Sequence, residues 1–373
     1  MKRISYFPMY IIFVLLVSSS LTAEWPQFRG NTAQTGVASD KLLKSLKLLW
    51  SYDTGAEIGS TPALTNTSVH IGTEGKKFLS LDILTGKKKW EFFSKGEISS
   101  SALVLEGKVF FGDEMGYFYA LDEVTGKEIW RFEEKDKIIS SPNYALNGVL
   151  FGSYDGSLYF LDRKNGKLLW KFETESPVHG SPAVFENSVI IAGCDGNLRF
   201  IDIPSGKEEF NISLESNIAS SPAVSGGQVF ISSLTGKFFS ADIKDRKIIW
   251  NYFNKENDQC SSSPAVTKER VIFGTRGNFL RCLNKENGKL LWTFTAKEGI
   301  DSSPVVVESK EGETVYFGSS DGKMYGVKTA DGKKVFEYDT GSAITGSLSV
   351  SDGRIVFGTS GGIVYCFSGK KEK

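Results

Sequence analysis

Residues Ala120–Trp130, with the sequence ALDEVTGKEIW, decide the fold of this chain. Their pattern is small-x-Asp-x-x-x-Gly-Lys-x-x-Trp. It returns at 80–90 and, with Phe in place of the small residue, at 160–170, and weaker copies occupy 200–210, 240–250, 282–292 and 326–336. Internal copies of this kind indicate a repeat architecture, whose type depends on the period.

The aromatic residue that ends each copy recurs at a nearly constant interval. These anchors are spaced by 40, 40, 40, 40, 40, 42 and 44 residues: Trp50, Trp90, Trp130, Trp170, Phe210, Trp250, Trp292 and Phe336. A period near 40 with strand-turn-strand content is typical of a propeller or a solenoid. We place the two extra residues in the loop between Trp250 and Pro264, and the four extra residues at 308–313.

Residues 140–173 show the content of one repeat. Four runs rich in apolar, β-branched and aromatic residues are predicted as strands at 141–145, 148–153, 158–162 and 167–173. Asp-Gly at 155–156 and Asn-Gly at 165–166 separate the later runs, and such pairs supply the positive φ of a tight hairpin turn. Four short strands at this spacing form one propeller blade.

The predicted innermost strands share a signature. Ser-Pro recurs with Ser at 141, 181, 221, 263 and 303, and Thr61-Pro62 is a variant. Since proline cannot donate to a strand ladder, it belongs on an edge, and we expect this edge to be free and to face the central channel. An apolar ring, four residues before the proline position, is interpreted as core between blades: Ile58, Ile98, Ile138, Val178, Ile218, Cys260, Ile300 and Ile344.

Counting the units predicts a closed ring. Units of three strands begin near Thr61, Ser101, Ser141, Ser181, Ser221, Ser263, Ser303 and Ser347, which makes eight. The last unit, 347–368, has no fourth strand after it, while the strand around Trp50 has no unit before it. Pairing these two would remove the open edges. The predicted fold is all-β, an eight-bladed β-propeller of four-stranded antiparallel blades, closed by an N-terminal strand.

The chain is expected to be exported. Lys2 and Arg3 precede an apolar run at 11–17 and small residues up to Ala23, the order of a secretory signal peptide. We predict a signal peptide at 1–23, an extended lead-in at 24–45, the propeller at 46–368 and a polar tail at 369–373; an uncleaved anchor is the alternative. With no cysteine near the cleavage site for a lipid anchor, we expect a soluble periplasmic or secreted monomer without an integral membrane segment.

Composition argues against nucleic acid as the partner. Lys+Arg and Asp+Glu both number 44, and the sequence pI is about 6.8. Although export invites disulfides, the four cysteines stand at positions that favour small buried hydrophobes, and we predict four free thiols: Cys194, Cys260, Cys282 and Cys366.

The repeat resembles the tryptophan-docking motif of the pyrroloquinoline quinone (PQQ) propellers. The match is complete at Ala120, Asp122, Gly126, Lys127 and Trp130, and the resemblance covers about residues 45–368. The pattern Trp-Pro-x-Phe-Arg-Gly at 25–30 also looks like the start of many bacterial PQQ-like repeat proteins. The resemblance implies the fold but leaves the activity open, because that superfamily contains quinoprotein dehydrogenases and also a non-enzymatic scaffold of outer-membrane assembly.

The resemblance implies that a dehydrogenase would hold PQQ over a calcium ion in the channel, often with a disulfide of adjacent cysteines. This chain has no adjacent cysteines. Calcium takes six to eight oxygen ligands, and the ring expected at the channel mouth offers one acid and one imidazole: Gly59, Ser99, Ile139, His179, Ala219, Ser261, Asp301 and Thr345. We therefore expect no catalytic residue, no metal and no cofactor, with PQQ as the alternative.

Repeated charged residues have a structural interpretation. The aspartates at 82, 122, 162, 202 and 242 precede the Gly-Lys turns and are expected to accept hydrogen bonds from the turn amides. The lysines at 87, 127, 167, 207, 247, 289 and 333 are expected to be solvated. A lone histidine such as His179 more often has a structural role, and no second one stands at zinc-ligand spacing.

One end of the propeller is predicted to be acidic. The loops between blades and the turns between second and third strands share an end face, and acidic residues outnumber basic ones on it. We expect a basic partner segment to dock there near blades two to four, on Met115, Tyr117, Glu134, Asp136, Tyr154, Glu173, Glu175 and His179. The sequence thus favours a protein-binding scaffold of the cell envelope over a quinoprotein enzyme or a receptor that binds a small ligand in its channel.

Overall fold

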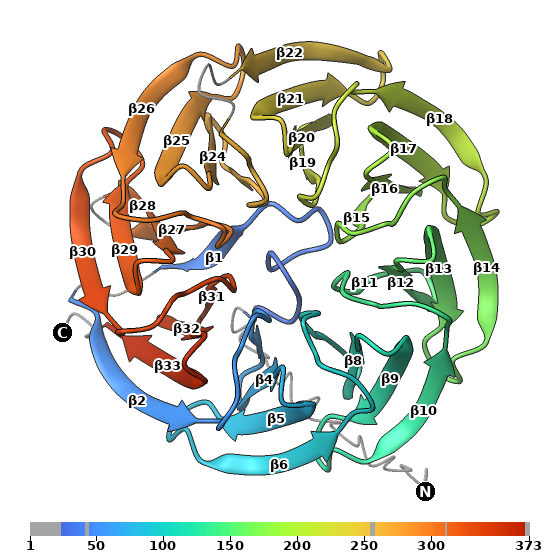
Figure 1. The fold of residues 1–373 in the computed structure, drawn as a ribbon, viewed down its shortest axis with the longest axis vertical. Coiled ribbons are helices and arrows are strands. Elements are labelled where there is room, and N and C mark those ends of the chain that lie inside the picture. Colours follow the sequence, from blue (N-terminus) through green and yellow to red (C-terminus); the bar gives the residue numbers. More distant parts are fainter. Residues whose placement is uncertain (1–23, 42–44, 254–257, 310–311, 370–373) are drawn as a thin grey trace, which may run out of the picture.

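The computed structural model describes residues 24–41, 45–253, 258–309 and 312–369. Eight β-sheets stand around a central axis like the blades of a propeller (Figure 1). The predicted signal peptide at 1–23 lies outside the described residues, as do 42–44, 254–257, 310–311 and 370–373. No helix within the described ranges is long and apolar enough to cross a membrane.

Each blade runs from an inner strand at the axis to an outer strand at the rim. The innermost strands are β3 (Ala63–Leu64), β7 (Leu103–Leu105), β11 (Asn143–Ala145), β15 (Ala183–Phe185), β19 (Ala223–Ser225), β23 (Ala265–Val266), β27 (Val305–Ser309) and β31 (Ser349–Ser351). The second strands are β4 (Ser68–Gly72), β8 (Lys108–Gly112), β12 (Gly148–Gly152), β16 (Ser188–Ala192), β20 (Gln228–Ser232), β24 (Arg270–Gly274), β28 (Gly312–Gly318) and β32 (Arg354–Gly358). The third strands are β5 (Lys77–Asp82), β9 (Tyr117–Asp122), β13 (Ser157–Asp162), β17 (Asn197–Asp202), β21 (Lys237–Asp242), β25 (Phe279–Asn284), β29 (Lys323–Lys328) and β33 (Ile363–Ser368). The outer strands are β6 (Lys88–Phe93), β10 (Glu128–Glu133), β14 (Leu168–Glu173), β18 (Glu208–Ser213), β22 (Lys247–Phe253), β26 (Leu290–Thr295), β30 (Lys334–Asp339) and β2 (Lys47–Asp53).

The ring is closed by the two ends of the chain, as the sequence predicts. Strand β2 pairs antiparallel with β33, with Trp50 opposite Cys366, and supplies the outer strand of the last blade. The remaining order in each blade is antiparallel from the axis outward. The expectation of an eight-bladed propeller closed by an N-terminal strand is therefore confirmed.

One blade departs from the prediction of four strands. Strand β1 (Val37–Lys41) pairs in parallel with β27 and makes this sheet five-stranded, in the order β1-β27-β28-β29-β30. Residues 308–309 and 312–313 of the predicted insertion at 308–313 extend β27 to Ser309 and begin β28 at Gly312, and Glu308 is the backbone partner of Lys41 in the parallel pairing. The longer inner hairpin therefore gives β1 an edge to pair with.

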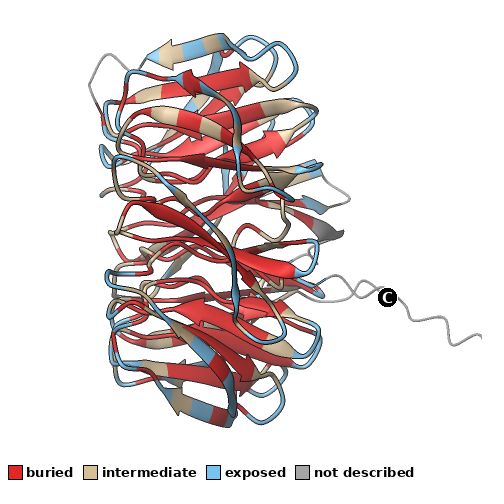
Figure 2. Cartoon of the chain, turned by 90° about the vertical axis from the view of Figure 1, so that its right-hand side faces the viewer, coloured by how far each residue is buried: buried red, intermediate tan, exposed pale blue. Residues whose placement is uncertain are grey.

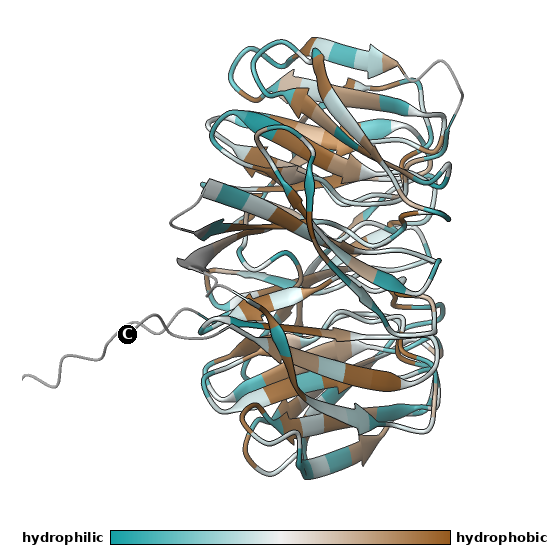
Figure 3. Cartoon of the chain, turned by 90° about the vertical axis from the view of Figure 1, so that its left-hand side faces the viewer, coloured by the Kyte–Doolittle hydropathy of each residue, from teal (hydrophilic) through white to brown (hydrophobic). Residues whose placement is uncertain are grey.

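The blades pack against one another through large side chains that meet glycines. The indole of Trp90 lies against Gly126 of the next blade, and Ile138 lies against Gly112 of the blade before it. All eight members of the predicted apolar ring are at most 1 % exposed, which confirms their place in the core. Figures 2 and 3 show buried, apolar strand segments across the thickness of the disc, with exposed polar segments at many of the loops.

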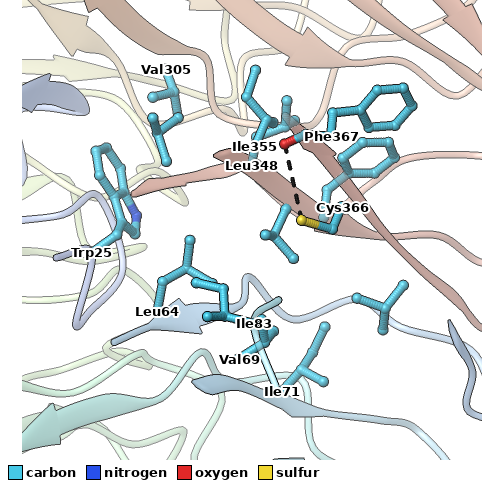
Figure 4. Close-up of a cluster of buried hydrophobic side chains, with 14 of the residues drawn as sticks. Trp25, Leu64, Val69, Ile71, Ile83, Val305, Leu348, Ile355, Cys366 and Phe367 are labelled. Carbon is cyan, nitrogen blue, oxygen red and sulfur yellow. Dashed lines mark hydrogen bonds between the residues drawn. The ribbon is translucent and has the colours of Figure 1, made fainter. Parts of the chain in front are cut away.

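Residues near the N-terminus also belong to the core. Trp25 is buried in the cluster formed by the first, seventh and last blades, with Leu64, Val305 and Leu348 (Figure 4). Its backbone pairs with that of Leu64 in β3. The lead-in predicted as extended therefore contacts the inner part of the ring.

Turn residues behave as the sequence predicts. Asp122 Oδ1 accepts a hydrogen bond from the backbone N–H of Thr125, and Asp82 does the same for Thr85. The hydroxyls of Thr125 and Thr85 also donate to these carboxylates, and the hydroxyl bonds first, together with the backbone bonds, lower the pKa of both carboxyls. The seven turn lysines are exposed. The four cysteines are unpaired, three of them buried and Cys194 half-buried.

Candidate functional site

Residues 25–36 cross the centre of the ring (Figure 1). Backbone N–H groups of the inner strands donate to backbone carbonyls of this segment, from Val104 to Pro26, Val184 to Thr32, Val224 to Ala33, Val266 to Thr35 and Val306 to Gly36. The prediction of free inner edges is therefore wrong at these five blades and also at the first, where the Leu64 N–H donates to Trp25 O. Because main-chain groups satisfy these edges without specific side chains, this path could not be predicted from residue types.

Side chains fasten the same segment. Arg29 Nη2 donates to the carbonyl oxygens of Pro264 (3.0 Å) and Pro304 (2.6 Å), and Gln34 donates to that of Pro182 (3.1 Å). Arg29 is 1 % exposed, and burial lowers its pKa to about 9, so it remains charged at neutral pH. Among the described residues no carboxylate pairs with this guanidinium, and its Nε and Nη1 have no hydrogen-bond partner.

A circle of hydrogen bonds joins the eight blades above this segment. The residue before each inner-strand proline, or its equivalent in the second and last blades, donates its backbone N–H to the side-chain oxygen of the equivalent residue in the next blade, at 2.9–3.1 Å. The circle runs through Thr61, Ser101, Ser141, Ser181, Ser221, Ser263, Ser303 and Ser347 and returns to Thr61. The serine of the recurrent Ser-Pro dipeptide thus has a structural role of its own, because its hydroxyl oxygen links neighbouring blades.

These eight hydroxyl groups line a cavity of about 170 Å³ on the axis. Phe28, from the crossing segment, also lines it. The walls on the other side of the hydroxyl circle are the eight residues predicted to ring the channel mouth, from Gly59 in the first blade to Thr345 in the last. The sequence therefore predicted the mouth correctly but missed both the hydroxyl circle and the segment beneath it.

Two titratable side chains stand at the mouth of this cavity. His179 Nδ1 lies 2.8 Å from the hydroxyl oxygen of Tyr154 in the preceding blade, and burial lowers the pKa of His179. Asp301 forms a salt bridge with Arg276 at 3.0 Å and accepts a hydrogen bond from Ser261. Both groups are thus fixed by neighbours from adjoining blades.

The mouth opens on the end face that was predicted to be acidic. Loops and turns of neighbouring blades meet there, since the backbone N–H of Glu114 donates to Glu97 O and that of Glu134 to Gly116 O. Burial and the carboxylates of Glu57, Glu97 and Glu114 raise the pKa of Glu74. Four glutamates from two blades therefore create a concentrated negative potential beside the mouth, although Lys137 pairs with Glu114 at 2.8 Å.

The structure places the eight predicted docking residues on this side of blades two to four. Gly116 lies against the carbonyls of Glu134 and Asp136, which brings its neighbours Met115 and Tyr117 to the same loop. Met115 is 60 % exposed. In the next blade, Thr174 donates to Gly156 O, and its two neighbours Glu173 and Glu175 are exposed. Tyr154 and His179 stand apart from these groups, at the mouth of the cavity.

Sequence comparison agrees with this architecture. Residues 43–131, 96–179, 154–293 and 276–372 match the family described as outer membrane protein assembly factor BamB. The chain belongs to this family. It is a PQQ-like β-propeller, and no curated protein matches it.

Solved structures share the fold of this BamB-family chain. BamB from Moraxella catarrhalis is 18 % identical, with a TM-score of 0.75 over 88 % of this chain and 99 % of that one. The quinohemoprotein alcohol dehydrogenase from Comamonas testosteroni is 15 % identical, with a TM-score of 0.78 over 94 % and 81 %. A europium-containing methanol dehydrogenase is also 15 % identical, with a TM-score of 0.78 over 93 % and 98 %. At these identities the likeness shows the fold alone, since one fold supports scaffolds and enzymes.

Proposed function

We propose that this chain is a protein-binding scaffold of the cell envelope, which docks a basic segment of a partner protein on its acidic end face. Membership of the BamB family supports an assembly role. The crowding of the carboxylates of Glu57, Glu74, Glu97 and Glu114 supports the choice of this face, since these neighbours, after burial, raise the pKa of Glu74. Such a field speeds the approach of a basic segment.

The apolar part of the proposed contact is Met115. It stands exposed beside the loop of Glu134 and Asp136, so a docked segment would meet an adaptable apolar side chain next to acidic groups. Methionine is enriched at interfaces because its flexible thioether adapts to different surfaces. Tyr117, whose ring lies 5.9 Å from the Arg131 guanidinium carbon, extends this patch toward the rim.

Site-specific photo-cross-linking in the native host tests the location. A cross-linker at Met115 is compared with one at Val124, which is 77 % exposed and lies in a turn between third and fourth strands, at the opposite end of the strands. We expect one partner protein to be captured from position 115 and not from position 124. Equal capture from both positions, or capture from position 124 alone, would assign the contact elsewhere.

The enzyme alternative is tested by the fit of PQQ to the central cavity. PQQ is a tricyclic quinone that carries several carboxylates, yet no lysine or arginine lines the cavity. Its volume of about 170 Å³ is below the roughly 300–1,000 Å³ of pockets for drug-sized ligands. Within the described ranges, no three His, Cys, Asp or Glu side chains are grouped to hold a metal ion. The residues present therefore do not fit PQQ with its calcium ion.

We further infer that the mature chain begins at Glu24 and acts as a monomer in the periplasm or outside the cell. Trp25 is already buried against Leu64, so a chain cut after Ala23 would start just before its first core residue. Intact mass and light scattering of the protein purified from its native envelope test this. A mass that retains residues 1–23, or a stable dimer, would contradict it.

A further inference from the structure

We propose that the central cavity binds a small uncharged polyhydroxy compound, a polyol or a single sugar ring, between the hydroxyl circle and Phe28. This inference goes beyond the scaffold role and does not depend on it. It rests on three features of the cavity: the unused hydrogen-bonding capacity of its hydroxyl groups, the charges above and below them, and the aromatic ring at its base.

The hydroxyl groups retain their capacity to donate. Each side-chain oxygen in the circle accepts one backbone N–H, as Ser181 does from Ser141 at 2.9 Å. No hydrogen bond in the described parts of the chain uses the O–H of these eight residues as donor. All eight are between 4 and 6 % exposed and line the cavity. Each can therefore offer a ligand one donor and one further acceptor position.

A ring that both donates and accepts matches a ligand that does the same. An alcohol hydroxyl has one donor and two lone pairs, so neighbouring groups of a polyol can alternate with the serines around the circle. A purely cationic or purely anionic ligand would use only half of this capacity. Buried polar groups that are left without partners cost free energy, which favours a ligand able to satisfy both kinds.

Charge also selects against ions. On the mouth side the crowded carboxylates of Glu57, Glu74, Glu97 and Glu114 repel an anion, while Asp301 there is paired with Arg276 and Glu114 with Lys137. On the other side Arg29 bonds to the carbonyls of Pro264 and Pro304, each directly after a serine of the circle, and its unpaired positive charge repels a cation. A neutral ligand between these layers meets neither penalty.

Phe28 gives the cavity an apolar base. It belongs to the segment whose backbone pairs with the inner strands three residues beyond the hydroxyl circle, on the side away from the mouth. The C–H groups of a polyol can lie on this ring while its hydroxyls reach the serines. The volume of about 170 Å³ limits the ligand to a single small ring or chain.

The test uses D-glucose and myo-inositol as probes, and saturation-transfer NMR measures their binding to the full mature chain. Ala219, in the cavity wall, is replaced by Trp to fill the mouth, and Asn217→Trp in the same loop is the matched control, because Asn217 is exposed and does not line the cavity. We expect binding of at least one probe by the wild-type chain, loss of at least tenfold in affinity in A219W, and unchanged binding in N217W.

Several results would overturn the proposal. These are the absence of binding by both probes up to high millimolar concentration, equal binding by A219W and N217W, or stronger binding of sulfate or spermidine than of either probe. A Phe28→Leu variant gives an independent check, since it should weaken binding while its melting temperature stays close to that of the wild type. Because Glu134 and Asp136 do not line the cavity, charge reversal at these two positions should leave probe binding intact.

Discussion

The six-membered part of the Trp90 indole lies directly over Gly126 of the next blade, so that a Cβ added to Gly126 would be 2.5 Å from Trp90 Cε3. The indole N–H also donates to Glu123 O at 2.9 Å. This pair repeats between Trp130 and Gly166 and around most of the ring. The repeated motif is thus defined largely by the two residues of this contact between blades, the tryptophan that ends one copy and the glycine of the next copy.

Replacing Gly126 by Ala tests this contact. The matched control is Gly107→Ala in the same blade, because both glycines have a positive φ, +69° and +71°, but no atom lies within 4 Å of a Cβ at Gly107. Both variants carry the backbone strain of an L-residue in this region, about 1–2 kcal/mol. Gly126→Ala should lose about 1–3 kcal/mol more through overpacking, measured by urea unfolding. Equal losses would show that the indole moves aside freely.

Trp50 tests closure of the ring. It is 9 % exposed in β2, and its indole donates to Ile83 O of the first blade at 3.0 Å, while its neighbour Leu49 is 48 % exposed. Trp50→Ala should cost about 3–5 kcal/mol, and Leu49→Ala within about 0.5 kcal/mol. Calorimetric melting of the two variants measures the difference. If Trp50→Ala melts at the wild-type temperature, the closing strand contributes little.

The hydroxyl circle makes a separate prediction. Ser181→Ala removes the acceptor of the Ser141 N–H, and a buried donor left without a partner costs about 1–3 kcal/mol. Ser181→Thr keeps the hydroxyl, as Thr61 does in the first blade, and should lose much less. Amide hydrogen exchange at Ser141 gives the direct readout, with faster exchange expected in the Ala variant only. Unchanged exchange in Ser181→Ala would contradict the role of the circle.

His70 predicts how stability depends on pH. It is fully buried in β4, and burial lowers its pKa, an effect that Glu123 at 3.8 Å partly offsets. The unfolded chain then binds more protons than the folded one below about pH 6.5, the ordinary histidine pKa. The free energy of unfolding is therefore at its full value above that pH and decreases as the pH falls toward the pKa of His70 in the folded chain. His70→Phe should flatten this decline in urea unfolding between about pH 6.5 and 5.

The design of that variant follows the repeat. Phe110 and Phe230 occupy the same register position in their blades, and Phe230 faces Ser240 as His70 faces Ser80. The replacement should therefore fold. Burial also lowers the pKa of His179, so the variant keeps the part of the pH dependence that comes from His179. An identical pH profile for wild type and variant would mean that the His70 pKa does not shift on folding.

The sequence predicted the ring because every blade repeats the same interblade contacts, so that one motif such as Ala120–Trp130 determines eight sheets. It also predicted the mouth residues and the shared face, since strand direction alternates within each blade. It missed the path of residues 25–36, because Val104, Val184 and the equivalent residues are bound through main-chain groups that any sequence offers. The Ser or Thr that recurs at the start of each unit was a visible signal of the hydroxyl circle. It was missed because the dipeptide was interpreted through its proline, which explains a strand edge, and the hydroxyl residue was given no role.

Charge reversal on the acidic face tests the central claim most directly. A variant with Glu134, Asp136, Glu173 and Glu175 changed to Lys is compared with one in which the turn lysines 87, 127, 167 and 207, which lie on the opposite face, are changed to Glu. The measurement is the association rate with the partner captured at Met115, at several salt concentrations. We predict a rate at least tenfold lower for the first variant, with the wild-type rate falling as salt rises, since exposed charges are screened beyond about 8–10 Å. A wild-type rate in the first variant, together with a lower rate in the second, would contradict the account and place recognition on the turns.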